Sequence, residues 1–100
     1  MPYLLIRQRF ADYNQWREAF DSLAEQRSAV GLETVAVTRD MGDPAEAVVL
    51  FRFDDIEQVK KHFPSPELEG AWRRGGVIEG SSQATFLREA EESAGNPRSA

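Results

Sequence analysis

The sequence predicts an α+β fold of the ferredoxin-like, split βαβ type, in which a four-stranded antiparallel sheet carries its helices on one face. Three observations support this fold class. Segments rich in strand formers and segments with helical spacing follow one another in the order strand, helix, strand, strand, helix pair, strand. Capping residues and glycines stand at the expected ends of the helices. A chain of 100 residues has room for one hydrophobic core.

The first strand and the first helix are predicted from the opening third of the chain. Residues 3–10, YLLIRQRF, are rich in strand formers. Asp12 can cap a helix, and Gln15 follows at capping-box spacing. Apolar spacing then continues to Gly31, a residue suited to end a helix. The members of this helical stripe are Tyr13, Trp16, Phe20, Leu23, Arg27 and Val30. We therefore expect one helix between Asp12 and Gly31.

The middle of the chain predicts a β-hairpin. Residues 32–41, LETVAVTRDM, alternate between apolar and polar side chains, as a strand does. Residues 42–46, GDPAE, begin with three turn formers, and residues 47–53, AVVLFRF, have the composition of a buried strand. The two strands around this turn are expected to pair.

The remaining elements are two short helices and a last strand. Asp55 with Gln58 makes a second capping box, and the helix that it begins ends at Pro64. In SPELEGAWRRGGV, Ser65 is an N-cap for a helix that ends at the double glycine after residue 74. Residues 84–90, ATFLREA, predict the last strand. Residues 1–90 are thus expected to form one domain. The polar residues 91–100 are expected to be a disordered tail.

Composition excludes several classes of protein. The net charge of −5 disfavours binding to nucleic acid, and no apolar run approaches the ~20 residues of a membrane-spanning helix. The chain contains no cysteine and one histidine, so neither a disulfide framework nor a transition-metal site is expected. A cytoplasmic protein without a cofactor, a nucleic-acid partner or a membrane partner is the expectation.

Both faces of the predicted sheet are apolar. Along residues 47–53, one face carries Ala47, Val49, Phe51 and Phe53, and the opposite face carries Val48 and Leu50. A sheet with one face in water should instead alternate between apolar and polar residues. We therefore expect a homodimer that joins sheet to sheet. The alternative is a monomer whose second face is apolar without a partner.

Four segments carry a resemblance to a known family: DYNQWREAF, GDPAEAVVLFRFDD, SPELEGAWRRGGV and ATFLRE. Together they resemble the dimeric α+β barrel proteins of the antibiotic biosynthesis monooxygenase type, over roughly residues 3–90. The resemblance implies a dimer with facing sheets and a cavity between sheet and helices in each subunit. Some members of that family oxidise polyketide phenols with O₂ and neither metal nor flavin. Others degrade haem, cyclise polyketides or have no known activity.

The family's functional residues carry over in part. Trp72 matches a tryptophan that cofactor-free oxygenases place on the helix before the last strand. Where those enzymes often have an asparagine one turn earlier, this chain has Leu68. Haem-degrading members have an asparagine on the first strand and a histidine after the tryptophan. Here the strand carries Gln8, and His62 precedes Trp72.

The candidate catalytic residues are His62 and Arg7. His62 is the only side chain with an ordinary pKa near neutrality, so it is the candidate proton shuttle; the alternative is a residue at the boundary of the core. Arg7, Arg9 and Arg52 are charges on otherwise apolar strands. They either pair with carboxylates or bind an anion, and the candidate carboxylates are Glu33, Asp40 and Glu89.

The candidate substrate-binding residues are Trp72, Tyr13, Trp16 and Arg52. Each tryptophan is either a plain core residue or part of a pocket wall, and Tyr13 has a hydroxyl suited to a cavity mouth. We thus expect a protein that binds a small aromatic or polyketide-like molecule, either as a cofactor-independent monooxygenase or as a cyclase. The alternative is a binding or dimerisation module without chemistry. A cleft of several hundred Å³ would favour the enzyme, and a closed core would favour the module.

Overall fold

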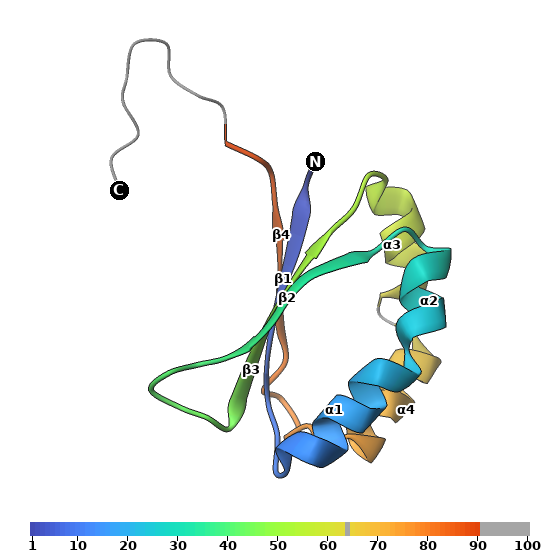
Figure 1. Cartoon of the computed structure of the whole chain (residues 1–100). Coiled ribbons are helices and arrows are strands. Elements are labelled where there is room, and N and C mark those ends of the chain that lie inside the picture. The colour runs from blue at the N-terminus through green and yellow to red at the C-terminus, as the bar shows by residue number, and fades with distance from the viewer. Residues whose placement is uncertain (64, 91–100) are drawn as a thin grey trace, which may run out of the picture.

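The computed structural model describes residues 1–63 and 65–90, apart from the side chain of His62. The described strands form one antiparallel sheet in the order β2-β3-β1-β4, and the helices lie together on one side of it (Figure 1). In chain order the elements are β1 (Tyr3–Arg9), α1 (Tyr13–Ser22), α2 (Ala24–Ala29), β2 (Glu33–Arg39), β3 (Glu46–Arg52), α3 (Ile56–His62), α4 (Pro66–Arg74) and β4 (Gln83–Leu87). This arrangement confirms the predicted α+β, ferredoxin-like class.

Two further expectations concern the tail and membrane-spanning helices. The tail expected at residues 91–100 lies outside the described residues. Within residues 1–63 and 65–90, none of the helices has the length and the apolar character needed to cross a membrane.

The single helix expected between Asp12 and Gly31 is wrong, because the chain breaks into α1 and α2 at Leu23. There the backbone leaves the helical region (φ −95, ψ 8), and the Leu23 N–H donates to the carbonyl of Phe20 at 3.2 Å. Side chains satisfy the last carbonyls of α1: the Ser22 hydroxyl donates to Ala19 at 2.6 Å. The Arg27 guanidinium donates to Phe20 at 2.7 Å. These bonds replace those of a continuing helix.

Only one of the two hydrogen bonds expected of the first capping box forms. The Asp12 carboxylate accepts from the Gln15 backbone N–H at 2.9 Å, as expected of an N-cap. The Gln15 side chain does not return to Asp12. Its amide donates to the carbonyl of Arg74 at 2.6 Å, which ties the start of α1 to the end of α4.

The caps of α3 and α4 are both present, and one differs in detail. Asp55 accepts from the backbone N–H of Glu57 at 3.0 Å, one residue before the predicted position Gln58. Ser65 accepts from the Leu68 N–H at 3.2 Å and Pro66 opens α4, as predicted.

Two aspartate side chains stabilise the turn between β2 and β3. The Asp40 carboxylate accepts from the backbone N–H groups of Gly42 at 2.7 Å and Asp43 at 3.0 Å. Asp43 in turn accepts from the Ala45 N–H at 3.1 Å. These side-chain bonds hold the turn that the GDPAE composition predicted.

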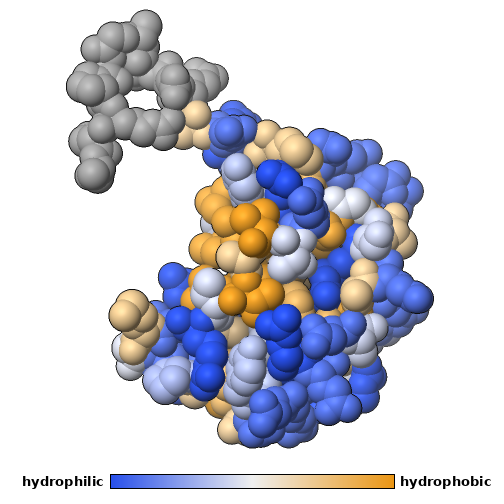
Figure 2. Space-filling view, viewed as in Figure 1, coloured by the Kyte–Doolittle hydropathy of each residue, from blue (hydrophilic) through white to orange (hydrophobic). Residues whose placement is uncertain are grey.

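The sheet separates its side chains as expected. Along β3, Ala47, Val49 and Phe51 are buried beneath the helices, whereas Val48 and Leu50 are only partly buried on the other side. We call that other side the open face. By strand register it carries Tyr3, Leu5, Arg7 and Arg9 of β1, Val48, Leu50 and Arg52 of β3, and Gln83, Thr85 and Leu87 of β4. Figure 2 shows hydrophobic atoms gathered in a hollow on this side, with hydrophilic atoms around them.

Candidate functional site

A small cavity of about 50 Å³ lies between the sheet and the helices. It is lined by Leu4, Ile6 and Gln8 of β1, Val49 and Phe51 of β3, Trp16, Ala19 and Phe20 of α1, Arg27 of α2, Leu68, Ala71 and Trp72 of α4, and Leu23, Leu32, Phe63, Gly75 and Val77 of the connections. A cavity of roughly 150 Å³ holds benzene, and ordinary ligand sites are larger still. As it stands, the space takes a few water molecules or a very small ligand.

Gln8 is one of two buried polar residues in the lining among the residues that the structure describes. It is 4% exposed, and its amide oxygen accepts from the Trp16 indole N–H at 3.0 Å. Its amide nitrogen donates to the hydroxyl of Ser82 at 3.1 Å. Both partners therefore fix the orientation of the amide. The sequence held a signal for this residue, because Gln8 continues the helix-facing alternation of Leu4 and Ile6.

Arg27 is the other buried polar residue, and it is 8% exposed. Its guanidinium carbon lies 3.9 Å from the centroid of the Phe20 ring. It is the only charged side chain in the lining among the described residues. The helical spacing placed Arg27 within the apolar stripe, and a charge at such a position was the signal for a special role.

Trp72 forms a wall of the cavity. Its ring meets Phe63 edge to face, with centroids 5.9 Å apart. Trp72 and Val77 line the cavity on one side and an outer groove of about 440 Å³ on the other. Ser82 also lines the groove, so its bond to Gln8 crosses the same wall. Motion of Trp72 would thus join the small cavity to a much larger space.

The chain after α4 holds this wall against β1. The N–H of Ile78 donates to the carbonyl of Arg9 at 2.9 Å, and the Arg9 N–H donates to the Ser81 hydroxyl at 3.1 Å. Val77 and Phe10 form an isolated bridge. These bonds hold the segment after α4 against β1.

Of the predicted substrate-binding residues, Trp16 and Trp72 line the cavity and Tyr13 does not. Tyr13 packs beside Phe10 and Trp16, with ring centroids 5.8 Å and 6.0 Å away. The Arg39 guanidinium lies 4.5 Å from the centroid of its ring. Tyr13 thus extends the aromatic row at the end of the core.

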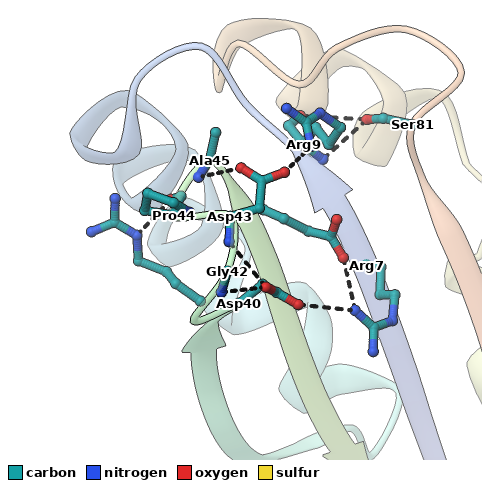
Figure 3. Close-up of polar contacts among 10 residues, drawn as sticks. Arg7, Arg9, Asp40, Gly42, Asp43, Pro44, Ala45 and Ser81 are labelled. Carbon is teal, nitrogen blue, oxygen red and sulfur yellow. Dashed lines mark hydrogen bonds and ion pairs between the residues drawn. The ribbon is translucent and has the colours of Figure 1, made fainter.

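Arg7 and Arg52, predicted to serve the site, lie instead on the open face. Arg7 pairs with Glu46 at 2.8 Å and lies 4.0 Å from Asp40 (Figure 3). Arg52 pairs with Glu33 at 2.6 Å, and this hydrogen bond raises the pKa of its guanidinium. The expected partners Asp40 and Glu33 are therefore confirmed, and the structure does not bring these arginines together with Trp72.

The other residues singled out from the sequence are Arg9, Glu89 and His62. Arg9 pairs with Asp43 at the hairpin turn (Figure 3). Glu89 pairs with the N-terminal amine at 2.8 Å and not with a strand arginine; this bond lowers the pKa of its carboxyl. The side chain of His62 lies outside the described part of the chain.

No cluster of His, Asp and Glu suited to a metal ion occurs among the residues that the structure describes.

Comparison with known proteins rests on structure, because no family model and no curated protein matches this sequence. A presumed antibiotic biosynthesis monooxygenase from Caulobacter crescentus matches with a TM-score of 0.70 at 17% identity, over 90% of each chain. A conserved protein from Methanosarcina mazei matches with a TM-score of 0.70 at 12% identity, over 89% of this chain and 92% of its own. A NIPSNAP family protein with unknown function from Agrobacterium tumefaciens matches with a TM-score of 0.67 at 15% identity, over 93% and 91%. At these identities the matches confirm the predicted resemblance at the level of the fold: this chain has the α+β fold of the antibiotic biosynthesis monooxygenase type.

Proposed function

We propose that this protein binds a small aromatic or otherwise apolar molecule in the cavity between sheet and helices, as a homodimer joined through the open face. The observation that carries the proposal is a cavity inside the core whose lining includes the buried polar residues Gln8 and Arg27. Protein cores are close-packed, and their buried polar groups are costly. A cavity and buried polar side chains both lower the stability of a core. Binding of a ligand therefore explains this lining better than a purely structural role does.

Movement of Trp72 would supply the room that the small cavity lacks. Trp72 is only partly buried, and it separates the cavity from the groove of about 440 Å³. Rotation of its indole would admit one aromatic ring, and the ring would take the place of the indole against the apolar lining. Side-chain rotation of this kind needs no rearrangement of the backbone.

The open face supports the homodimer. Leu5 pairs directly with Leu50, and Val48 lies beside them in the same register. These side chains are partly buried by one chain alone. A second copy would remove them from water, which is the usual reason for an apolar sheet face.

Catalysis by the protein would go beyond ligand binding. A cofactor-independent monooxygenase would need O₂ as co-reactant and an electron-rich phenol as substrate, and a cyclase would need only positioning and exclusion of water. The aromatic lining suits both tasks, and His62 stays the candidate proton shuttle. Uptake of O₂ by the protein with naphthols, measured without added metal or flavin, tests the oxygenase.

A second candidate is a dimerisation module without a ligand. The small cavity volume of about 50 Å³ favours it, because that is far below the size of ordinary ligand sites. In this alternative Trp72 is a core residue that never leaves the wall. The two functions differ in one measurable respect, which is whether Trp72 responds to small aromatic molecules.

Fluorescence titration separates them. The variant Trp16→Phe leaves Trp72 as the sole tryptophan, and a panel of phenols, naphthols and quinones should quench it saturably. The matched variant Trp72→Phe should weaken that binding by about 1 kcal/mol, the scale of one lost aromatic contact. Linear, unsaturable quenching by every compound would exclude the ligand site and favour the module.

A further inference from the structure

Arg27 places a charged side chain in the lining of an apolar cavity. Its side chain is 8% exposed, and it shares the cavity lining with residues such as Leu32, Phe51 and Leu68. Among the described residues it forms no ion pair with a carboxylate. This differs from Arg7, Arg9 and Arg52 on the sheet, each of which has an acidic partner.

Most of the Arg27 donors make no hydrogen bond to the described part of the protein, and none of them is buried without a partner. A guanidinium has five N–H donors, and the structure records one side-chain hydrogen bond from this group, to the carbonyl of Phe20 at 2.7 Å. The Phe20 ring supplies a cation–π contact. Burial lowers the pKa of the Arg27 guanidinium; the nearby charge of Asp21 opposes that shift, and the charge of Arg17 adds to it. A buried charge without a carboxylate is costly to the fold.

The other polar group in the lining, the amide of Gln8, is uncharged and does not neutralise Arg27. Its oxygen accepts from Trp16 and its nitrogen donates to Ser82, and it makes no hydrogen bond to Arg27 in the described part of the chain. The remaining lining is apolar. The cavity is therefore complementary to a molecule with an apolar body and one anionic group.

We infer that the ligand of this cavity is a small apolar carboxylate, held by its carboxylate at Arg27 and by its apolar body against the aromatic lining. A planar guanidinium fork binds a carboxylate through two parallel hydrogen bonds, which suits the donors of Arg27 that make no hydrogen bond to the described part of the protein. The inference rests on the proposed function, because it assigns the chemical class of the molecule that enters past Trp72.

The alternative role of Arg27 is to cap α1. Its bond to Phe20 satisfies a carbonyl at the C-terminal end of that helix, where a cation is favourable. Such a cap would stabilise the protein and would not distinguish charged from uncharged ligands. Ligand selectivity therefore separates the two roles, and stability does not.

Calorimetric titration of the unmodified protein with benzoate and with benzamide, its uncharged counterpart of nearly equal shape, tests the inference. Benzoate should bind roughly 10-fold more tightly, the scale of hydrogen bonds to a charged group. Arg27→Met should remove this preference by weakening benzoate alone, and Arg27→Lys should keep part of it. The matched control is Arg17→Met, because Arg17 also lies near the Phe20 ring, at 5.6 Å, yet pairs with Asp21.

The outcomes separate this inference from the proposed function. Equal binding of benzoate and benzamide would overturn the role of Arg27 and leave the cavity as a ligand site. Absence of binding by either compound, together with unsaturable quenching of Trp72, would overturn both. If Arg27→Met does not fold, the benzoate preference of the unmodified protein and its persistence in Arg27→Lys still decide the matter.

Discussion

Gln8 lies on the helix-facing side of β1, between the apolar residues Ile6 and Phe10. Its amide joins the strand to α1 through Trp16 and to the segment after α4 through Ser82. One side chain thus connects β1, α1 and the segment after α4. Buried polar groups with all partners in place specify a unique arrangement, and they are costly when one partner is lost.

A double-mutant cycle on this bond tests its strength. Gln8→Leu should lower the free energy of unfolding by about 1–3 kcal/mol, because the Trp16 indole N–H is left buried without an acceptor. Trp16→Phe removes that N–H, so Gln8→Leu should cost less in its presence, by a coupling of at least about 0.5 kcal/mol. Urea denaturation of the four proteins measures the coupling. Purely additive effects would show that the bond contributes nothing specific.

For single residues, the sequence predicts which side chains face the core better than it predicts their hydrogen-bond partners. Helical spacing indicated that Trp16 and Trp72 face inward, and both line the cavity. Spacing alone could not show that Gln8 and Arg27 are buried with them, because a polar residue on an apolar face either turns to solvent or finds a partner within the core. That choice depends on residues distant in sequence, such as Ser82, which lies 74 positions from Gln8.

At the scale of elements, α1 and α4 approach each other closely, and residues of both helices line the cavity. Gly75 closes α4, and a Cβ at this position would lie 2.9 Å from the Cβ of Ala19. Its backbone is in the right-handed region (φ −78), so conformation alone would admit alanine. The glycine is therefore required for the close approach of the two helices.

Gly75→Ala should lower the free energy of unfolding by about 1–3 kcal/mol, as overpacking of a core contact does. Gly70→Ala is the matched control within α4, because its Cβ would meet only the flexible end of Arg74 at 3.6 Å. That control should stabilise the protein by about 0.5–1 kcal/mol, the usual gain of alanine over glycine within a helix. Thermal or urea unfolding compares the two. Equal effects at both positions would refute the close contact.

The order and type of the elements could be predicted, whereas one boundary could not. The apolar spacing of the first helix runs unbroken through Leu23. At the break, side chains of Ser22 and Arg27 bond to the carbonyls at the end of α1. Apolar periodicity reports which face is buried, and it carries no information on such bonds. The turn between β2 and β3 was predictable because Asp40 and Asp43 act within their own segment.

At the scale of the whole molecule, the open face has an apolar centre and a charged border. Leu5, Val48 and Leu50 occupy the centre, and the pairs of Arg7 with Glu46 and of Arg52 with Glu33 lie beside it. Paired charges at the rim and apolar residues at the core are typical of an interface between proteins. A second copy of the chain, placed across a two-fold axis, would match this pattern.

Light scattering tests the assembly. The unmodified protein should have about twice the mass of one chain, which is 11.3 kDa. Leu50→Arg should yield monomer or unfold the protein, because it would bury an unpaired charge in the interface. Ala29→Arg, at an exposed position of α2, is the control and should remain dimeric. Monomeric unmodified protein at micromolar concentration would exclude the homodimer.

The most direct test of the cavity is where a bound ligand lies. With isotope-labelled methyl groups and an aromatic ligand from the panel, intermolecular nuclear Overhauser effects report which side chains touch it. The proposed site predicts contacts to the methyls of Leu4, Ile6 and Val49, which line the cavity beneath the helices. Contacts confined to Leu5 and Leu50 on the open face, or no contacts at saturating ligand, would contradict the account.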